Sequence, residues 1–289
     1  MFKRNSHLGE IVLILILLAI TIPIAQKTII EEKFTEGSFE YNGITTEYIE
    51  YENSDVPTIL FMHGAGLSAS AYFECLEYLN TNYRVIAPNI PPFGWSTIPG
   101  DSWDLTDFAE YFNKFIEDQG LKNIILIGHS FGGGISANLA NISDEIDYLI
   151  LIDAVGGISI DMDFGKGYGT LIDGMMKGFK KDISRTLLAV GNNILNLPHV
   201  LSDTEQIERI FKKSLGSLYE YNNIDIPVTI LWGEFEQDDF DEEAALYLES
   251  IIDGADLQFV GGGHDWLYFE PERFYFLVDN LIKNYFDNK

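Results

Sequence analysis

Ser130 lies in the pentapeptide Gly128-His129-Ser130-Phe131-Gly132, which directly follows the apolar run Ile124–Ile127. An apolar run, then glycine, serine and glycine at alternate positions, then a helix-compatible stretch, predicts a strand, a sharp turn and a helix. Such a turn lifts a serine hydroxyl above a sheet, and glycine is expected on both sides because a Cβ there would clash. Taken alone, the residues also fit a glycine-rich turn that closes an ordinary αβ unit, so the partners of the serine decide the matter.

A nucleophilic serine needs a base, because its hydroxyl is a poor nucleophile at neutral pH. His264 is the favoured candidate among the five histidines of the chain. It lies in the glycine-rich loop Gly261–Asp265, just after the last expected strand. Such a loop can place an imidazole beside a serine at the same edge of a sheet.

The other four histidines have positions that favour different roles. His7 precedes an apolar N-terminal run, and His199 lies beside a proline in a long insertion. His63 follows an expected strand in a His-Gly turn, where a structural hydrogen bond is expected. His129 is adjacent to Ser130, so on a sharp turn its side chain should point away from the serine hydroxyl.

The base needs a carboxylate to orient its second nitrogen. The loop after the expected strand Val228–Trp232 is the predicted place, and it holds four acids: Glu234, Glu236, Asp238 and Asp239. The position is therefore predictable and the identity is not. Asp153, directly after the preceding expected strand, is a competitor.

Attack on a carbonyl creates an oxyanion, which two preorganised backbone donors must stabilise. One expected donor is the N–H of Phe131, at the start of the helix that follows the serine. The second is expected from the turn His63-Gly64-Ala65-Gly66, from the N–H of Ala65.

Five motifs in this order give the chain a resemblance to the α/β-hydrolases of the capped esterase and lipase-like type, over about Phe34 to Lys289. They are His63-Gly64-Ala65-Gly66, Pro91-Pro92-Phe93-Gly94-Trp95-Ser96, Gly128-His129-Ser130-Phe131-Gly132, Leu231-Trp232-Gly233-Glu234 and Gly262-Gly263-His264. The motifs are specific for the fold and weakly specific for the substrate.

The resemblance implies an acid three residues after the glycine of the Trp-Gly turn, which is Glu236 here. Aspartate is commoner at that place, so Asp238 and Asp153 stay open as alternatives. The family also often has aspartate where Asn89 stands, and this departure is expected to affect loop packing.

The remaining elements predict how these loops are carried. An Asn42-Gly43 hairpin within 39–51 leads into alternating strands and helices, with a helix expected over 68–80 and a capping Asp104 before a helix over 105–118. This alternation predicts a mostly parallel, doubly wound α/β sheet. We expect an α/β-hydrolase core over residues 31–153 and 227–289, with an insertion between the two parts.

The insertion, residues 154–226, contains no clear strand and two helix-like patches, 175–190 and 205–218. It is expected to form a helical cap over the carboxyl ends of the strands, where open α/β sheets place their sites. An apolar acyl pocket would be lined by residues of this cap: Met175, Met176, Phe179 and Leu187.

Composition excludes several classes of function. The net charge of −27 repels phosphate backbones, so nucleic-acid binding is not expected. Cys75 is the single cysteine, which excludes an intramolecular disulfide and a cysteine-based metal cluster. No motif for a metal or an organic cofactor is present, and the expected partner is a small ester-like molecule.

The N-terminal segment, residues 1–30, predicts contact with a membrane. Lys3 and Arg4 precede an apolar run over 11–25, which is short for a bilayer span and has no convincing cleavage site. An uncleaved anchor is favoured over a secretory signal, with the catalytic domain outside the cytoplasm.

These features together favour a membrane-anchored serine hydrolase that cleaves a small or medium carboxylic ester through an acyl-enzyme. Carbon–carbon bond hydrolysis or cofactor-free perhydrolysis on the same triad is an alternative chemistry. A non-catalytic ligand-binding module that retains the pocket is the alternative from a different class.

Overall fold

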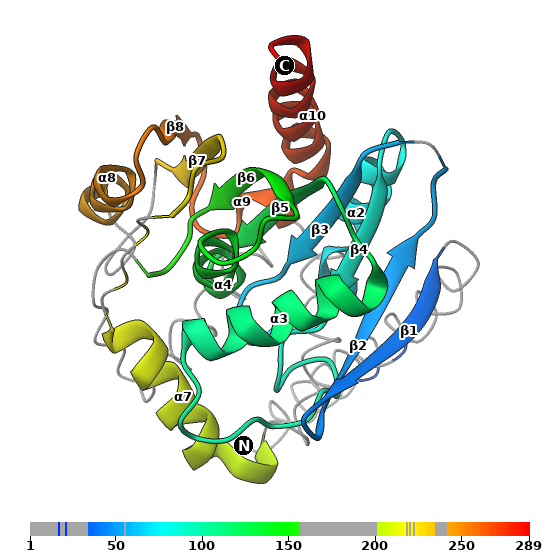
Figure 1. Ribbon diagram of the computed structural model, residues 1–289, viewed down its shortest axis with the longest axis vertical. Helices are drawn as coiled ribbons and strands as arrows, with labels where there is room; N and C mark the ends of the chain where they lie inside the picture. The colour runs from blue at the N-terminus through cyan, green and yellow to red at the C-terminus, as the bar shows by residue number, and fades with distance from the viewer. Residues whose placement is uncertain are drawn as a thin grey trace, which may run out of the picture.

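The computed structural model describes residues 34–54, 56–156, 201–217, 219, 221, 223–234 and 242–289, together with Leu17 and Thr21. Eight strands form one sheet in the order β1-β2-β4-β3-β5-β6-β7-β8 (Figure 1). Their bounds are β1 Thr35–Tyr41, β2 Ile44–Tyr51, β3 Thr58–Met62, β4 Arg84–Pro88, β5 Ile124–His129, β6 Ile146–Ile152, β7 Val228–Gly233 and β8 Asp256–Val260.

The sheet begins with an antiparallel hairpin and is parallel from β4 to β8. β1 pairs with β2 around Asn42 and Gly43, whose φ angles are 52° and 78°. Two successive left-handed residues give the hairpin turn whose twist matches the twist of its strands. β2 pairs antiparallel with β4, and every pairing from β4 to β8 is parallel. The carboxyl ends of these six strands therefore lie at one edge, as the sequence predicts.

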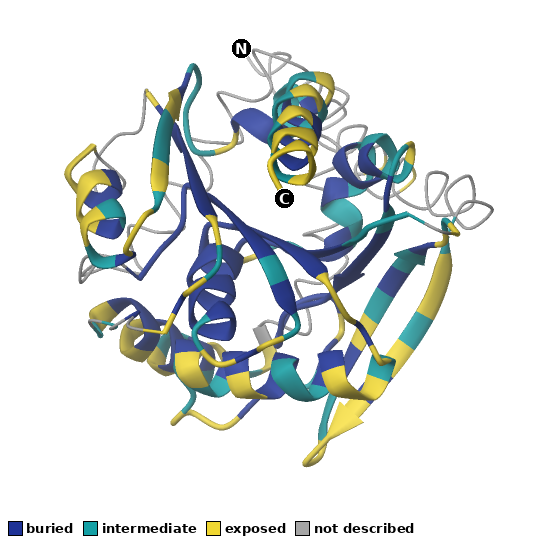
Figure 2. Ribbon diagram, turned by 45° about the horizontal axis from the view of Figure 1, so that its top comes forward, coloured by how far each residue is buried: buried dark blue, intermediate teal, exposed yellow. Residues whose placement is uncertain are grey.

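Helices cover both faces of the sheet (Figure 1). Their bounds are η1 Ala69–Tyr72, α2 Phe73–Asn80, α3 Leu105–Gln119, α4 Phe131–Ala140, η2 Leu201–Asp203, α7 Thr204–Gly216, α8 Glu242–Ile251, α9 Trp266–Phe269 and α10 Pro271–Asp287. One core cluster joins the sheet to α3, α4, α7 and α8, and the other joins it to α2, α9 and α10. Along β3, Leu60 and Met62 enter the first cluster, whereas Ile59 and Phe61 enter the second. The central strands are almost entirely buried, and the helices turn exposed faces outward (Figure 2).

The elements agree closely with the sequence pattern, with two differences. Asp104 caps α3 by accepting a hydrogen bond from the N–H of Thr106 at 2.9 Å, as expected. The helix expected over 68–80 begins as the 3-10 turn η1 before it continues as α2. The short helix α9, directly after His264, has no counterpart in the sequence analysis, because four residues carry no readable period.

The two sequence segments of least certain role fall mostly outside the described residues. Within the insertion 154–226, the structure describes η2 and α7, and α7 coincides with the second expected helix. The first expected helix, with Met175, Met176, Phe179 and Leu187, lies outside the described residues. No helix in the described part of the chain is long and apolar enough to cross a bilayer. The anchor at residues 1–30 stays a prediction, since only Leu17 and Thr21 of it are described.

The turn from β5 into α4 brings the helix against the sheet. A Cβ on Gly128 would overlap α4 at Ser136 and at the main chain of Gly132. A Cβ on Gly132 would overlap the carbonyl oxygens of Met62 and His63 at the end of β3. Both glycines are therefore required by close backbone approach, which is the reason that the sequence analysis gives for them.

Gly132→Ala is expected to destabilise the protein by about 3 kcal/mol or more, because backbone atoms cannot move aside as a flexible side chain can. The control is Gly216→Ala at the end of α7, where an added Cβ meets nothing within 4 Å. That change should leave stability equal or slightly higher, since alanine is the better helix former. Urea unfolding midpoints of both variants test this, and equal midpoints would show that α4 does not lie so close to β3.

Candidate active site

Ser130 is held in a conformation that side chains rarely adopt. Its φ is 53° and its ψ is −119°, at the junction of β5 and α4. Its N–H donates to the carbonyl of Ile152 at 2.9 Å, and its carbonyl accepts from the N–H groups of Gly134 and Val155. These bonds to β6 and α4 fix the main chain on both sides of the serine. Strain of about 1–3 kcal/mol at such a residue persists only where the surroundings determine its geometry.

The structure brings the serine and the predicted base together. The Ser130 Oγ lies 2.9 Å from the His264 Nε2, within hydrogen-bond distance. The two residues are far apart in sequence, and they meet because β5 and β8 end at the same edge of the sheet. In this geometry, the serine hydroxyl donates to the imidazole and can pass its proton to it.

The turn after β3 lies alongside the serine. A Cβ built on Gly64 would be 3.3 Å from the Cβ of Ser130. His63 donates from Nδ1 to the carbonyl of Gly64 at 2.8 Å and accepts from the N–H of Ile90 at its Nε2, at 2.7 Å. His63 therefore has the structural hydrogen bonds expected from the sequence. Because C=O and N–H point in opposite directions across a trans peptide, its bond to Gly64 also fixes the direction of the Ala65 N–H.

Both expected oxyanion donors retain an available N–H. Among the described residues, neither the N–H of Ala65 nor the N–H of Phe131 has an acceptor. The N–H of Gly64, in contrast, donates to the Tyr72 hydroxyl at 2.7 Å. The amide that follows Gly64 and the first amide of α4 therefore stay the expected oxyanion donors.

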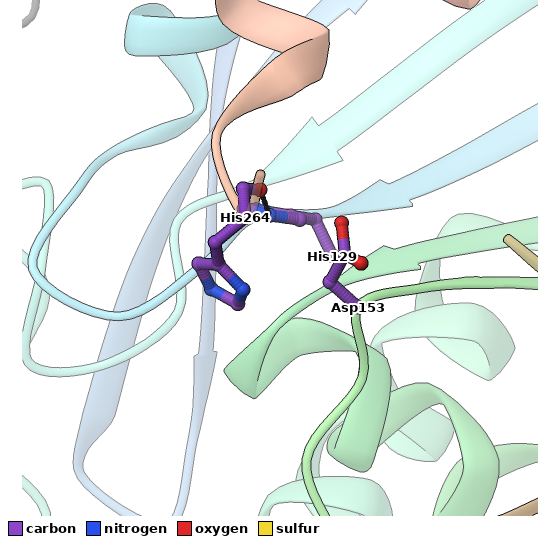
Figure 3. Close-up of side chains that lie close together, drawn as sticks. All are labelled: His129, Asp153 and His264. Atoms are coloured by element: carbon purple, nitrogen blue, oxygen red, sulfur yellow. Dashed lines mark hydrogen bonds between the residues drawn. The ribbon is translucent and has the colours of Figure 1, made fainter. Parts of the chain in front are cut away.

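His129 lies behind the site, with no hydrogen bond to Ser130. Its Nε2 is 3.0 Å from the carbonyl oxygen of His264, and its Nδ1 is 2.7 Å from the Tyr72 hydroxyl. Figure 3 shows the first of these bonds. Burial, followed by the proximity of His264, lowers the pKa of His129 well below its ordinary value. Tyr72 carries no sequence signature of this contact, because a tyrosine in a helix-like stretch is ordinarily core.

Of the candidate acids, the structure describes the exposed Glu234 at the end of β7 and, at the end of β6, Asp153. Asp153 is fully buried, with a φ of 45°. Its two oxygens accept from the N–H of Gly233 at 2.6 Å and from the Nε1 of Trp266 at 3.2 Å. The carboxylate thus joins the ends of β6 and β7 to α9. Glu236 and Asp238 lie outside the described residues.

Asp153 also lies near two histidines, a combination of side chains that can bind a metal ion. One potential ligand atom from each of His129, Asp153 and His264 lies within 4.8 Å of the other two (Figure 3). However, the His129 Nε2 must donate to a carbonyl, so this nitrogen has no lone pair for a metal. Both Asp153 oxygens already accept N–H groups. The arrangement therefore fits a hydrogen-bonded site better than a metal centre.

One aromatic side chain of the insertion packs against the residue that follows the serine. The Phe211 ring, on α7, lies with its centroid 4.6 Å from that of Phe131 and 5.9 Å from that of Phe93. All three rings are buried.

Asn89 holds the proline-rich loop after β4. It donates to the carbonyl of Gly94 at 3.1 Å and accepts from the N–H of Ala69 at 2.9 Å. An aspartate could not donate to Gly94, so the departure at position 89 concerns the packing of this loop.

The bonding of His63 predicts an acid-sensitive fold. Burial lowers the pKa of His63 to about 4, from 6.5. The unfolded chain therefore binds the proton first, and stability is lost as the pH falls from about 6.5 toward about 4, by up to about 1.4 kcal/mol per pH unit. In urea unfolding, the stability advantage of the wild type over His63→Gln should shrink across this range, because the variant lacks the group. An advantage that stays constant would contradict the assignment.

Comparison with known proteins identifies the family to which this fold belongs. A family model described as alpha/beta hydrolase fold matches residues 57–211, more than half of the chain. A probable 1-acylglycerol-3-phosphate O-acyltransferase of Oryza sativa subsp. japonica is 31% identical over 129 residues, which cover 43% of this chain and 31% of that protein. The match thus spans less than a third of that relative.

Two solved structures share the fold over most of the chain. A membrane phospholipase A, described as a bacterial virulence factor, superposes with a TM-score of 0.72 at 19% identity and covers 98% of this chain and 99% of its own. The carboxylesterase CesB of Bacillus subtilis gives a TM-score of 0.69 at 17% identity, covering 91% and 96%. Identities this low support the fold alone. With the family model matched across β3, β5 and the serine turn, the chain belongs to the α/β-hydrolase family.

Proposed function

We propose that this protein hydrolyses a small or medium carboxylic ester through an acyl-enzyme on Ser130. The observation that carries the proposal is the 2.9 Å contact between the Ser130 Oγ and the His264 Nε2. A serine beside an imidazole, with backbone donors next to it, is the arrangement that acyl transfer requires. The esterase among the structural neighbours supports this choice of reaction at the level of the fold.

Acylation begins when the Ser130 oxygen attacks the ester carbonyl carbon and its proton passes to the His264 Nε2. The carbonyl oxygen becomes an oxyanion, which the N–H groups of Ala65 and Phe131 stabilise. The tetrahedral intermediate then collapses. The bond to the alkoxide oxygen breaks, His264 returns the proton to that oxygen, and an alcohol leaves.

Deacylation repeats the sequence with water as the nucleophile. His264 takes a proton from water, the resulting hydroxide attacks the acyl carbon, and the bond to Ser130 breaks as the serine recovers its proton. A carboxylic acid leaves. In both halves, Glu236 is proposed to accept a hydrogen bond from the His264 Nδ1 and to stabilise the imidazolium, with Asp238 and Asp153 as alternatives.

The acyl group of the substrate is proposed to lie against an apolar wall. Phe93, Phe131 and Phe211 supply aromatic rings from three different elements around the serine turn. The proposed cap would complete this wall with apolar side chains from outside the described residues: Met175, Met176, Phe179 and Leu187. Such a wall favours an apolar acyl chain over a charged one, because burial of a charge is costly.

Ser130→Ala is expected to abolish labelling by a fluorophosphonate probe and to lower ester turnover by about 1,000-fold or more, since the nucleophile is lost. Ser136→Ala is the matched control, because Ser136 is a fully buried serine of the same helix. It should retain labelling and turnover. Labelling of Ser130→Ala at the wild-type rate would refute the assignment of the nucleophile.

The acid is tested by Glu236→Gln, Asp238→Asn and Asp153→Asn, each made separately. Glu236→Gln is expected to lower kcat by about 10,000-fold, because the imidazole loses its orienting carboxylate. Asp153→Asn should instead lower the unfolding midpoint, because an amide cannot accept from both Gly233 and Trp266. Steady-state kinetics and urea unfolding separate the two effects. Loss of turnover in a stable Asp153→Asn protein alone would place the acid at the end of β6.

A further inference from the structure

An unbroken chain of buried hydrogen bonds connects the two sides of the site. The Gly64 N–H donates to the Tyr72 hydroxyl at 2.7 Å, and this hydroxyl contacts the His129 Nδ1 at 2.7 Å. The His129 Nε2 contacts the carbonyl oxygen of His264 at 3.0 Å. The chain therefore begins at the turn that carries the Ala65 amide and ends on the main chain of the base.

The bonding partners fix every proton in this chain. A carbonyl oxygen only accepts, so the His129 Nε2 carries the proton and donates to His264. The His129 Nδ1 is then an acceptor, and the Tyr72 hydroxyl must donate to it. The Tyr72 oxygen accepts in turn from the N–H of Gly64. A protonated His129 would break this order, because its Nδ1 would face the hydroxyl proton of Tyr72.

Burial keeps both side chains in the neutral forms that this order requires. Tyr72 and His129 are each 1% exposed. The Tyr268 ring packs with its centroid 4.6 Å from that of Tyr72 and 5.9 Å from that of His129. Burial raises the pKa of Tyr72 and lowers the pKa of His129. For side chains buried this deeply, an unmade hydrogen bond costs the full desolvation of its groups.

We propose that Tyr72 and His129 are positioning residues. Through this single chain of hydrogen bonds they hold the turn that carries the Ala65 amide (the oxyanion turn) at a fixed position relative to the loop that carries His264 (the base loop). The inference rests on the proposed ester hydrolysis. Tyr72 fixes the peptide that precedes Gly64, and His129 fixes the main chain at His264. The oxyanion donor and the imidazole must be correctly placed at the same moment, and small displacements of catalytic groups reduce kcat severely.

The neutral state of His129 has a second effect on catalysis. Its ring centroid lies 4.9 Å from that of His264, which gains a positive charge when it takes the serine proton. A charged neighbour at this distance would oppose that proton transfer. A neutral histidine holds the base loop without adding such a charge.

The first experiment deletes one hydroxyl from each of two buried tyrosines. Tyr72→Phe is expected to lower kcat for an activated ester by about 10- to 100-fold, with KM changed less than about 2-fold, because the oxyanion turn loses its anchor. Tyr83→Phe is the matched control. Tyr83 is also buried, and its hydroxyl donates to Asp279 at 2.7 Å, on α10. Tyr83→Phe should lower the unfolding midpoint and leave kcat unchanged. Equal kcat values for the two variants would overturn the inference.

Substitutions of His129 test the other end of the chain. Gln at position 129 can keep a donor near the position of Nε2, whereas Leu removes both hydrogen bonds. His129→Gln should therefore retain more kcat than His129→Leu. The double variant Tyr72→Phe/His129→Leu should lose less kcat than the product of the two single losses, because the two residues act through one chain. Independent, multiplying losses would overturn the inference.

A measurement without substrate separates this inference from the proposed function. Nitrogen-15 NMR of the wild type should find His129 neutral, with its proton on Nε2, from about pH 5 to about pH 8, and Tyr72→Phe should shift the Nδ1 resonance. Titration of His129 within that range would refute the chain of bonds even in an active enzyme. Absence of ester turnover and of fluorophosphonate labelling in the wild type would refute the proposed function, and a positioning role in that reaction with it.

Discussion

The main chain of Ser130 is the constraint on which the rest of the site depends. Its left-handed φ is maintained by hydrogen bonds to Ile152, Gly134 and Val155, so β5, β6 and α4 all meet at this one residue. A relaxed conformation would turn the side chain away from the edge of the sheet. Gly132 then lets α4 approach the carbonyl groups at the end of β3, which brings the turn after β3 beside the serine. The strain at one residue is thus supported by the packing of three strands and a helix.

The same edge of the sheet collects groups that are distant in sequence. Parallel strands all end there, and four of the following loops supply groups of the proposed site: the turn after β3, Ser130 after β5, Asp153 after β6 and the His264 loop after β8. The side-chain contacts between these loops are buried and polar. They fix the positions of the loops relative to one another, because each buried hydrogen bond left unmade would cost free energy. Rigidity at this edge comes from hydrogen bonds, whereas the two faces of the sheet are held by apolar packing.

Sequence analysis predicts the parts of the structure that have local signatures. The apolar run of β5, the glycines at 128 and 132 and the turn at Asn42-Gly43 each carry their own pattern, and the structure has the elements that they predict. The hydrogen bond between Tyr72 and His129 has no such pattern, since it depends on how η1 packs against the end of β5. The identity of the acid stays a prediction for the same reason: the loop after β7 offers several carboxylates, and spacing alone does not choose among them.

The two outer strands of the sheet also have a consequence for how copies of the chain behave at high concentration. A strand at the margin of a sheet presents unpaired N–H and C=O groups that can recruit another chain into a growing fibril. β1 carries Glu36 and Glu40, both exposed, and β8 begins with the exposed Asp256. Like charges on both margins, on a chain with a net charge of −27, make stacking of one copy on the next unfavourable. The acidic composition therefore disfavours aggregation through β1 and β8.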